Sequence, residues 1–332
     1  MAPNFKDLPK IELHLHLDCS LSYEVVKQLD PDITESEFNE EFIAPLGCTG
    51  LSDYIERASR GIELMQTKEQ LRLVTLDLFR QLKDDNVVYA EIRFAPLLHI
   101  QKGLSPHEVV ETVNNAAEEG IEKTGIEASI ILCTLRHYSE EQSMETVQLV
   151  DSFYGTLVCG FDIAADEAGF PVDNHLKAFQ FAKDRAINCT AHAGEAKGAE
   201  SVWETIQHFG PSRIGHGVRS AEDPSLIEYI QKHDIHLEIC PTSNILTKVF
   251  QKIEDHNIDS LFNKNVSLSV NTDGRTISNV TLEDEYLTLN RVFSWNYTHF
   301  KKCTFEALKH AFTTNAKKEI IRQRLNDSYK DL

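Results

Sequence analysis

Two histidines separated by one residue end an apolar run near the amino terminus, in the segment ELHLHLD. Side chains of a strand alternate between its two faces, so His14, His16 and Asp18 are expected to share one face. Two neutral imidazole nitrogens at this spacing can bind one Zn²⁺ ion if other strands supply further ligands. Taken alone, the pair is more typical of hydrogen-bonded histidines in a core.

Three later segments place further candidate ligands or acid–base groups where an apolar run ends. They are TAHAGE with His192 and Glu195, RIGHG with His216, and SVNTD with Asp273. Catalytic groups of barrel enzymes lie at the carboxyl ends of strands, so these side chains are expected to meet at one site. The agreement of four strand ends argues against a purely structural explanation.

Glu195 and His216 have neighbours that suit acid–base work. Ala193 and Gly194 separate Glu195 from His192 by a small, flexible connection that lets the carboxylate fold back towards the strand end. A closed and partly desolvated pocket would hold such a carboxyl protonated near neutral pH, as a general acid requires. The glycines on both sides of His216 permit a ring to approach closely.

Short apolar runs bounded by turn residues predict eight strands. These are Ile11–Leu17, Val87–Phe94, Ala128–Thr134, Leu157–Ala164, Ile187–Ala191, Arg213–Gly215, Ile235–Ile239 and Val266–Asn271. Amphipathic segments between and after them predict helices at Lys68–Lys83, His107–Lys123, Glu140–Ser152, Asp173–Lys183, Glu200–His208, Pro224–His233, Thr281–Phe293 and Thr304–Leu325. Such alternation implies parallel strands joined by right-handed crossovers, and eight of them can close into a (β/α)₈ TIM barrel of the α/β class. The alternative, a doubly wound open sheet, usually carries a phosphate loop, and neither GxGxxG nor GxxxxGK[ST] occurs here.

The interval between the first two strands, residues 20–85, is too long for one crossover helix and predicts extra helices inserted there. In a barrel this insertion would rise at the face that carries the active site. Its apolar residues either form a lid or pack the insertion onto the barrel; they are Tyr54, Ile55, Ile62, Leu64 and Met65. We interpret residues 1–332 as a single domain of this barrel type.

Composition excludes several classes of partner. The formal charge is −19, from 52 acidic and 33 basic residues, so the field of the molecule would repel nucleic acid and anionic membranes. Seven scattered cysteines form no CxxC pair, and the start of the chain has no apolar core of signal-peptide type. We therefore expect a cytoplasmic protein with a small-molecule partner, whose oligomeric state the sequence does not indicate.

The segments LPKIELHLHLD, TAHAGE, RIGHGV, CPTSN and NTD, in this order, closely resemble the adenosine deaminase family of metal-dependent amidohydrolases. The resemblance spans essentially the whole chain and includes YAEIRFAP and FDIAADEAGF. It implies zinc-dependent hydrolytic deamination of adenosine or deoxyadenosine to inosine or deoxyinosine, with release of ammonia. One Zn²⁺ per chain would be bound by four residues, His14, His16, His192 and Asp273, with water as the remaining ligand.

The same resemblance implies roles for the other site residues. Glu195 would protonate purine N1, His216 would orient the attacking hydroxide, and Asp273 would join them as the third catalytic residue. His16, Asp18 and Ala165 would contact the substrate. An Asp at position 18 resembles the family members that bind a ribose hydroxyl, whereas members acting on free adenine carry Glu. Alternatively, Asp18 orients His16.

Three positions depart from the family pattern and leave the identity of the purine open. Cys19 and Ala165 stand where glycine is usual, and Gly274 stands where many members have a second Asp that contacts N7. Arg275 either addresses a different substituent or is a solvated loop cation, which we favour. The alternatives are therefore an adenosine modified at the 5′ or N6 position, such as aminodeoxyfutalosine, or adenine itself.

Rival functions differ in the metal site. A binuclear amidohydrolase usually holds two metals through a modified lysine that ends the fourth strand, and Leu157–Ala164 contains no lysine. A cytidine-deaminase site needs HxE and PCxxC signatures, which are absent. A binding protein that has lost activity is disfavoured because every metal, acid and base position is intact.

Overall fold

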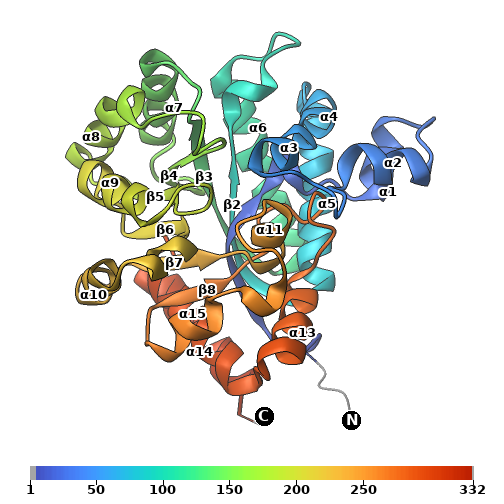
Figure 1. The fold of residues 1–332 in the computed structure, drawn as a ribbon. Helices are drawn as coiled ribbons and strands as arrows, with labels where there is room; N and C mark the ends of the chain where they lie inside the picture. The colour runs from blue at the N-terminus through green and yellow to red at the C-terminus, as the bar shows by residue number, and fades with distance from the viewer. Residues whose placement is uncertain (1–4, 331–332) are drawn as a thin grey trace.

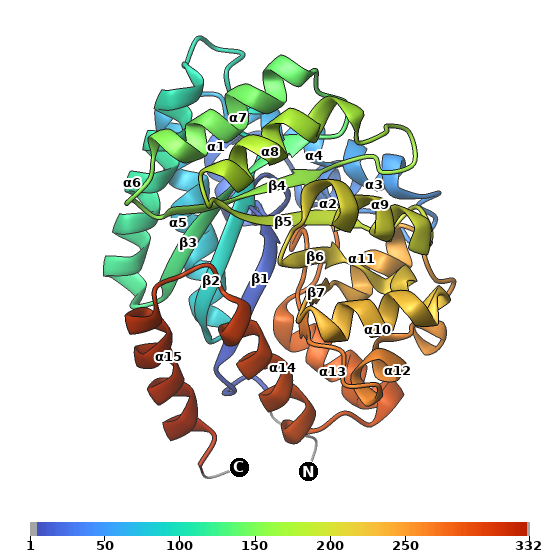
Figure 2. The same cartoon turned by 90° about the vertical axis from the view of Figure 1, so that its left-hand side faces the viewer.

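Eight strands within the described residues, 5–330 of the computed structural model, form one parallel sheet in chain order, β1 to β8. Figures 1 and 2 show the strands inside a layer of helices. The strands are β1 Lys10–His16, β2 Val87–Phe94, β3 Glu127–Leu135, β4 Val158–Ala164, β5 Asn188–Ala193, β6 Arg213–His216, β7 His236–Ile239 and β8 Leu268–Val270. Each lies within a few residues of a predicted strand, and the predicted (β/α)₈ barrel is confirmed.

The barrel closes between β8 and β1 through a side chain and a short extension of β8. The side-chain oxygen of Asn271 accepts hydrogen bonds from the backbone N–H groups of Leu13 and His14, at 2.9 and 3.2 Å. Beyond it, the N–H of His16 donates to the carbonyl of Asp273 at 2.7 Å, and the N–H of Asp273 donates to the carbonyl of His14 at 3.1 Å. Closure therefore brings Asp273 beside both histidines of β1.

Helices cover the outside of the barrel, and their ends follow local capping signals. For example, α6 begins at Pro106 after Ser105, whose hydroxyl and the Glu108 carboxylate form a reciprocal capping box. The covering helices are α5 Lys68–Asp84, α6 Pro106–Thr124, α7 Glu140–Ser152, α8 Leu176–Asp184, α9 Ala199–Phe209, α10 Pro224–Lys232, α11 Pro241–Leu246, α12 Ile258–Asn263 and α13 Leu282–Phe293. Single 3₁₀ turns occur at Leu17–Cys19, Pro96–His99, Asp173–His175, Val218–Glu222 and Ile253–Asp255.

The predicted insertion is present as four short helices before α5. They are α1 Tyr23–Leu29, α2 Glu35–Phe42, α3 Leu51–Glu56 and α4 Ala58–Glu63. Figure 1 shows them, in blue, at the upper end of the barrel, away from α14 and α15. Tyr54, Ile55 and Ile62 line a cavity at this end, whereas Leu64 and Met65 pack into the hydrophobic core. The insertion thus covers the site with one set of apolar residues and is anchored by the other.

The prediction of one closing helix over Thr304–Leu325 is wrong, because the chain forms two helices, α14 Tyr297–His310 and α15 Asn315–Ser328. Between them, the N–H of Phe312 donates to the buried Glu91 carboxylate, and the Phe312 ring lies 3.6 Å from the Arg213 guanidinium carbon. The hydroxyl of Thr314 then caps α15. These contacts with the lower end of the barrel break a helix that local periodicity alone would continue.

None of the helices in residues 5–330 is both long and apolar enough to cross a bilayer.

Candidate active site

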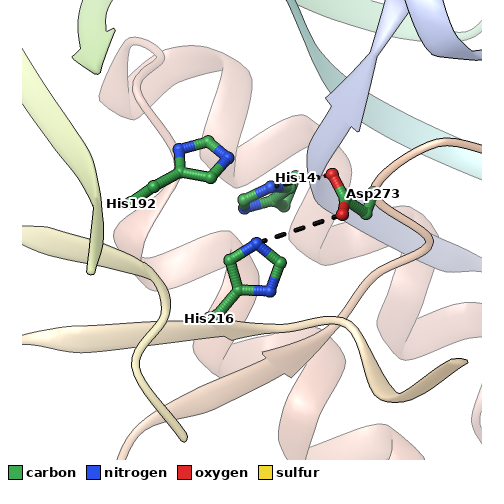
Figure 3. A group of neighbouring side chains, drawn as sticks. All are labelled: His14, His192, His216 and Asp273. Carbon is green, nitrogen blue, oxygen red and sulfur yellow. Dashed lines mark ion pairs between the residues drawn. The ribbon is translucent and has the colours of Figure 1, made fainter. Parts of the chain in front are cut away.

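Side chains from four segments face one another at the carboxyl end of the barrel. Figure 3 shows His14 from β1, His192 from β5, His216 from β6 and Asp273 after β8 around a common space. One nitrogen or oxygen of each lies within 4.8 Å of those of the others. His16, also from β1, borders the same cavity. The structure therefore brings together the predicted metal ligands from strands that are distant in sequence.

The closest approaches in this cluster involve one oxygen of Asp273 and three histidine Nε2 atoms. Asp273 Oδ1 lies 3.3 Å from Nε2 of His14 and 3.4 Å from Nε2 of His16, which is itself 3.2 Å from Nε2 of His192. Ligand atoms bound at about 2.0–2.2 Å to one tetrahedral ion stand about 3.3–3.6 Å apart. His14 Nε2 is buried and has no hydrogen-bond partner. These four side chains fit a divalent metal ion.

Buried carboxylates orient two of the histidines. Nδ1 of His14 lies 2.9 Å from Glu238 Oε2, and Nδ1 of His192 lies 3.1 Å from Asp162 Oδ2. Each carboxylate holds the ring hydrogen on Nδ1 and leaves the Nε2 lone pair free for a metal. Arg93 binds both carboxylates, at 2.7 Å for Glu238 and 2.8 Å for Asp162. These three residues were not predicted from the sequence, although a charged residue inside an apolar strand is a usable signal.

Three side chains of the site stand on left-handed backbone at strand ends. The φ angle is 76° at Ala165, 59° at His216 and 66° at Asp273. Residues other than glycine avoid this region at a cost of about 1–3 kcal/mol, and such strain gathers at functional sites. The left-handed conformation turns the backbone at the end of the strand and directs the segment that follows towards the mouth of the barrel.

Glu195 has the environment of a protonated acid. Its side chain is buried, and burial together with the charges of Asp273 and Glu167 raises the pKa of the carboxyl well above its usual range. Oε2 lies 3.6 Å from His216 Nε2, whereas Oε1 has no hydrogen-bond partner. A buried polar atom without a partner beside a cavity is suited to a ligand group.

Glu167, a residue of the DEAGF segment, fixes the loop that carries Glu195. Its carboxylate accepts four backbone N–H bonds, from Gly194 at 2.8 Å, Glu195 at 3.0 Å, Ala196 at 2.6 Å and Lys197 at 3.1 Å. It also accepts the hydroxyl of Ser201 at 2.6 Å. Sequence reasoning missed this role because all of these donors lie far along the chain from residue 167.

A cavity of about 240 Å³ opens between the histidine cluster and the insertion helices. Asp18 borders it, with Oδ2 3.8 Å from His99 Nε2 and 3.4 Å from the N–H of Ala95. Burial opposes ionisation of Asp18, but the bond with His99 and the nearby His16 outweigh it and lower the carboxyl pKa. The described lining contains carboxylates and histidines and no Lys or Arg.

The model of the adenosine deaminase family matches residues 9–328. The chain belongs to the adenosine deaminase family. An adenosine deaminase of Clostridium acetobutylicum is 36% identical over 327 residues, which cover 96% of this chain and 98% of the relative. One of Enterococcus faecalis is 32% identical over 330 residues, with 98% of both chains covered. Like its relatives, this chain is a hydrolase that acts on a cyclic amidine C–N bond.

Solved structures of lower identity share the fold of the deaminase. An adenine deaminase from Arthrobacter aurescens has a TM-score of 0.89 at 22% identity, covering 96% of this chain and 98% of its own. An N6-mAMP deaminase of Arabidopsis has a TM-score of 0.86 at 24% identity, covering 97% and 99%. An amidohydrolase with bound Zn, from Burkhoderia ambifaria, has a TM-score of 0.90 at 19% identity, covering 98% and 92%.

Two departures from the family pattern lie against each other in this deaminase. A Cβ atom placed on Gly274 would lie 2.8 Å from Cβ of Cys19 and 3.2 Å from the Tyr54 hydroxyl. Such a carbon–carbon approach is too close, so Cys19 fills the space that a side chain at position 274 would need. The third departure, Ala165, adds its methyl group to the cavity wall.

Both interpretations of Arg275 are corrected by the structure. Arg275 is buried, with one guanidinium nitrogen 2.7 Å from Glu12 Oε2 and 2.9 Å from Asp85 Oδ2. It lies neither on the described cavity wall nor in solvent. Its ion pairs with Glu12 and Asp85 hold the side chain in the interior, next to the junction of β8 with β1.

Proposed function

We propose that this deaminase converts adenosine and deoxyadenosine to inosine and deoxyinosine, with release of ammonia and with one zinc ion per chain. The observation that carries the proposal is the convergence of three histidine Nε2 atoms and Asp273 Oδ1 at 3.2–3.4 Å beside a carboxyl whose pKa is raised. The relatives named adenosine deaminases, which match almost the whole chain, support it.

Four residues would hold the zinc: His14, His16, His192 and Asp273. A bound zinc ion supplies Lewis acidity, which activates water for attack at neutral pH. A structural neighbour carries Zn on the same fold. β4 ends at Ala164 without a lysine, so this deaminase lacks the residue that usually bridges two metals, which supports a single ion.

The other site residues would act on the purine. The protonated carboxyl of Glu195 would donate its proton to N1, which makes C6 more electrophilic. His216 would orient the attacking water and stabilise the charge that develops on its oxygen, and Asp273 would accept a hydrogen bond from that water. Asp18 would accept a hydrogen bond from a ribose hydroxyl, and the backbone N–H of Ala165 would face N3 of the purine. His16, at the cavity wall, would contact the substrate as well as the metal.

The charge of the cavity favours a nucleoside over a nucleotide. The described lining includes no Lys or Arg to pair with a phosphate, and burial lowers the pKa of His137 at its edge. Asp18, whose pKa is lowered, would repel a dianionic group. A ribose hydroxyl, in contrast, satisfies that carboxylate. These features support adenosine over the substrates named for the nucleotide and base deaminases of the same fold.

A substrate panel on zinc-loaded enzyme tests the proposal. Ammonia release would be measured with adenosine, deoxyadenosine, adenine, N6-methyl-AMP and 5′-substituted adenosines. We expect kcat/KM to be highest for adenosine or deoxyadenosine. A higher kcat/KM for adenine, for N6-methyl-AMP or for a 5′-substituted adenosine would overturn the substrate assignment.

A further inference from the structure

A row of buried hydrogen bonds connects the backbone at the start of α12 to His216. The N–H of Ile258 lies 3.1 Å from Nδ1 of His256, whose Nε2 lies 3.3 Å from the side-chain oxygen of Asn244. The side-chain nitrogen of Asn244 lies 3.1 Å from Nδ1 of His216. The exposed fractions of Asn244, His216 and His256 are 0%, 1% and 3%. Asn244 belongs to the CPTSN segment, to which none of the roles above is assigned.

The donor direction along this row follows from its fixed end. A backbone N–H can only donate, so Nδ1 of His256 accepts and its ring hydrogen stands on Nε2. Asn244 must then accept through its oxygen and donate through its nitrogen. Nδ1 of His216 therefore accepts, and its ring hydrogen stands on Nε2. Burial lowers the pKa of His256 to about 3, which agrees with a neutral ring that carries one hydrogen.

Reversing Asn244 would break the row. Its side-chain nitrogen would then face the Nε2–H of His256, and two donors would oppose each other in a site that excludes water. Restoring that bond would need the ring hydrogen of His256 on Nδ1, where the N–H of Ile258 already points. The single backbone donor thus sets the direction of every bond up to His216.

His14 and His192 carry the opposite arrangement. Their Nδ1 atoms face the carboxylates of Glu238 and Asp162, which hold the hydrogen on Nδ1 and free Nε2 for a metal. His216 faces an amide donor instead. Its Nε2–H is directed towards Glu195 Oε2 at 3.6 Å and Asp273 Oδ2 at 4.0 Å.

We propose that Asn244 and His256 are positioning residues that hold the ring hydrogen of His216 on Nε2, which excludes this ring from the metal ligands and makes it a hydrogen-bond donor to the reacting atoms. The inference rests on the proposed role of His216 in deamination. It also decides which of two histidines is the fourth metal ligand. His16, whose Nε2 lies 3.4 Å from Asp273 Oδ1 and 3.2 Å from His192 Nε2, binds the metal, and His216 does not.

Asn244→Asp reverses the polarity of the row with little change of shape. A carboxylate accepts from both histidines, so the ring hydrogen of His216 moves to Nδ1. We expect kcat to fall ~10–100-fold, as for other partners that orient site groups, with KM within about threefold. ¹⁵N NMR of histidine-labelled protein, with His216 signals assigned from His216→Gln, would show the change of tautomer.

Two variants of His256 separate the hydrogen bond from the packing. His256→Gln retains a donor for Asn244 and is expected to retain most of kcat and the Nε2–H tautomer. His256→Phe fills the volume without a donor and frees Asn244 to reverse, so kcat falls at constant zinc content. His236→Phe is the matched control, because His236 is equally buried but binds Ser267 and Ser269 at the other end of the barrel. It is expected to keep kcat and the His216 signals.

An unchanged His216 tautomer in Asn244→Asp would overturn the inference, as would equal losses of kcat in His256→Phe and His236→Phe. The NMR measurement needs no substrate. If the wild-type protein failed to deaminate adenosine, the proposed function would fall while the tautomer of His216 would still be tested.

Discussion

Carboxylates are buried in two regions of the barrel: at its carboxyl end, the mouth, and below it in the lower interior around Arg93 and Arg213. The two regions neutralise the negative charge in different ways. In the lower interior, Arg213 lies 2.6 Å from Glu91 and 2.7 Å from Glu238, and Arg93 bridges Glu238 and Asp162. The mouth gathers Asp18, Glu195 and Asp273 with histidines, and its described lining has no Lys or Arg.

A buried carboxylate is costly unless a positive group or a proton neutralises it. The lower interior supplies its own cations and is structurally complete. The mouth retains a proton on Glu195, whose pKa is raised. Burial and Arg93 lower the pKa of His14, but the nearby carboxylates of Asp273 and Glu238 outweigh them and raise it. The mouth thus differs from the lower interior in having a group of side chains that could bind a cation from outside the chain.

Removing the binding site for that cation should have the largest effect. In His14→Ala the imidazole that points an unpaired Nε2 at Asp273 is absent. We expect zinc content to fall far below one per chain and deamination to fall to background, measured by elemental analysis and ammonia release. His208→Ala, at an exposed histidine of α9, should change neither quantity. Full zinc retention in His14→Ala would contradict the ligand assignment.

Removing the transferable proton of Glu195 should have the next largest effect on activity. Glu195→Gln preserves shape but cannot transfer a proton, so we expect kcat to fall ~10²–10⁴-fold. Zinc content should stay at one per chain, because the side chain is not among the proposed ligands. Glu200→Gln, at an exposed acid of α9, provides the control. Activity of Glu195→Gln close to that of the wild type would remove Glu195 from the mechanism.

In the lower interior, loss of a cation should affect stability. Arg93→Met leaves Asp162 and Glu238 without their shared partner, and we expect the free energy of unfolding to fall by about 3–5 kcal/mol. Arg185 makes an equally short pair with Asp151, at 2.7 Å, but this pair is exposed. Arg185→Met should therefore cost less than about 1 kcal/mol. Urea unfolding measures both, and equal losses would refute the distinction between the two pairs.

Glu285 tests burial with neither a cation nor a metal, and its effect should appear only in how the free energy of unfolding changes with pH. Its carboxylate accepts the N–H of Thr242 at 2.9 Å, yet burial raises its pKa from 4.5 to about 8. The folded state then binds more protons than the unfolded state between these values, so stability falls as pH rises through this range. Glu285→Gln keeps an acceptor for Thr242 and cannot ionise.

The measurement for Glu285 is the free energy of unfolding at pH 5, 7 and 9. Glu285→Gln should lose less stability than the wild type over this range, because one proton release on unfolding has been removed. Identical slopes in the two proteins would mean that the pKa of Glu285 is not raised by burial.

Local patterns predicted the strands well and some helices poorly. Val87–Phe94 and Glu140–Ser152 agree with the structure at both ends, because hydrophobic periodicity and capping residues are local signals. The helix predicted at Thr304–Leu325 is interrupted because Glu91 and Arg213, distant in sequence, bind Phe312. In the site, the strand-end motifs named the residues that converge. Glu167 and Asn244 lie in segments that resemble the family, but no local pattern there indicated which residues they contact, and Glu238 lies outside all of the quoted segments.

The sequence by itself determined the barrel and which side chains stand at its mouth, since strand periodicity and position at a strand end are properties of neighbouring residues. Only the tertiary structure decided the state of those side chains. His14 and His216 are the same residue type at two strand ends, yet one meets the carboxylate of Glu238 and the other the amide of Asn244. Proton placement and charge depend on the partner that folding delivers, and that partner comes from another strand or loop.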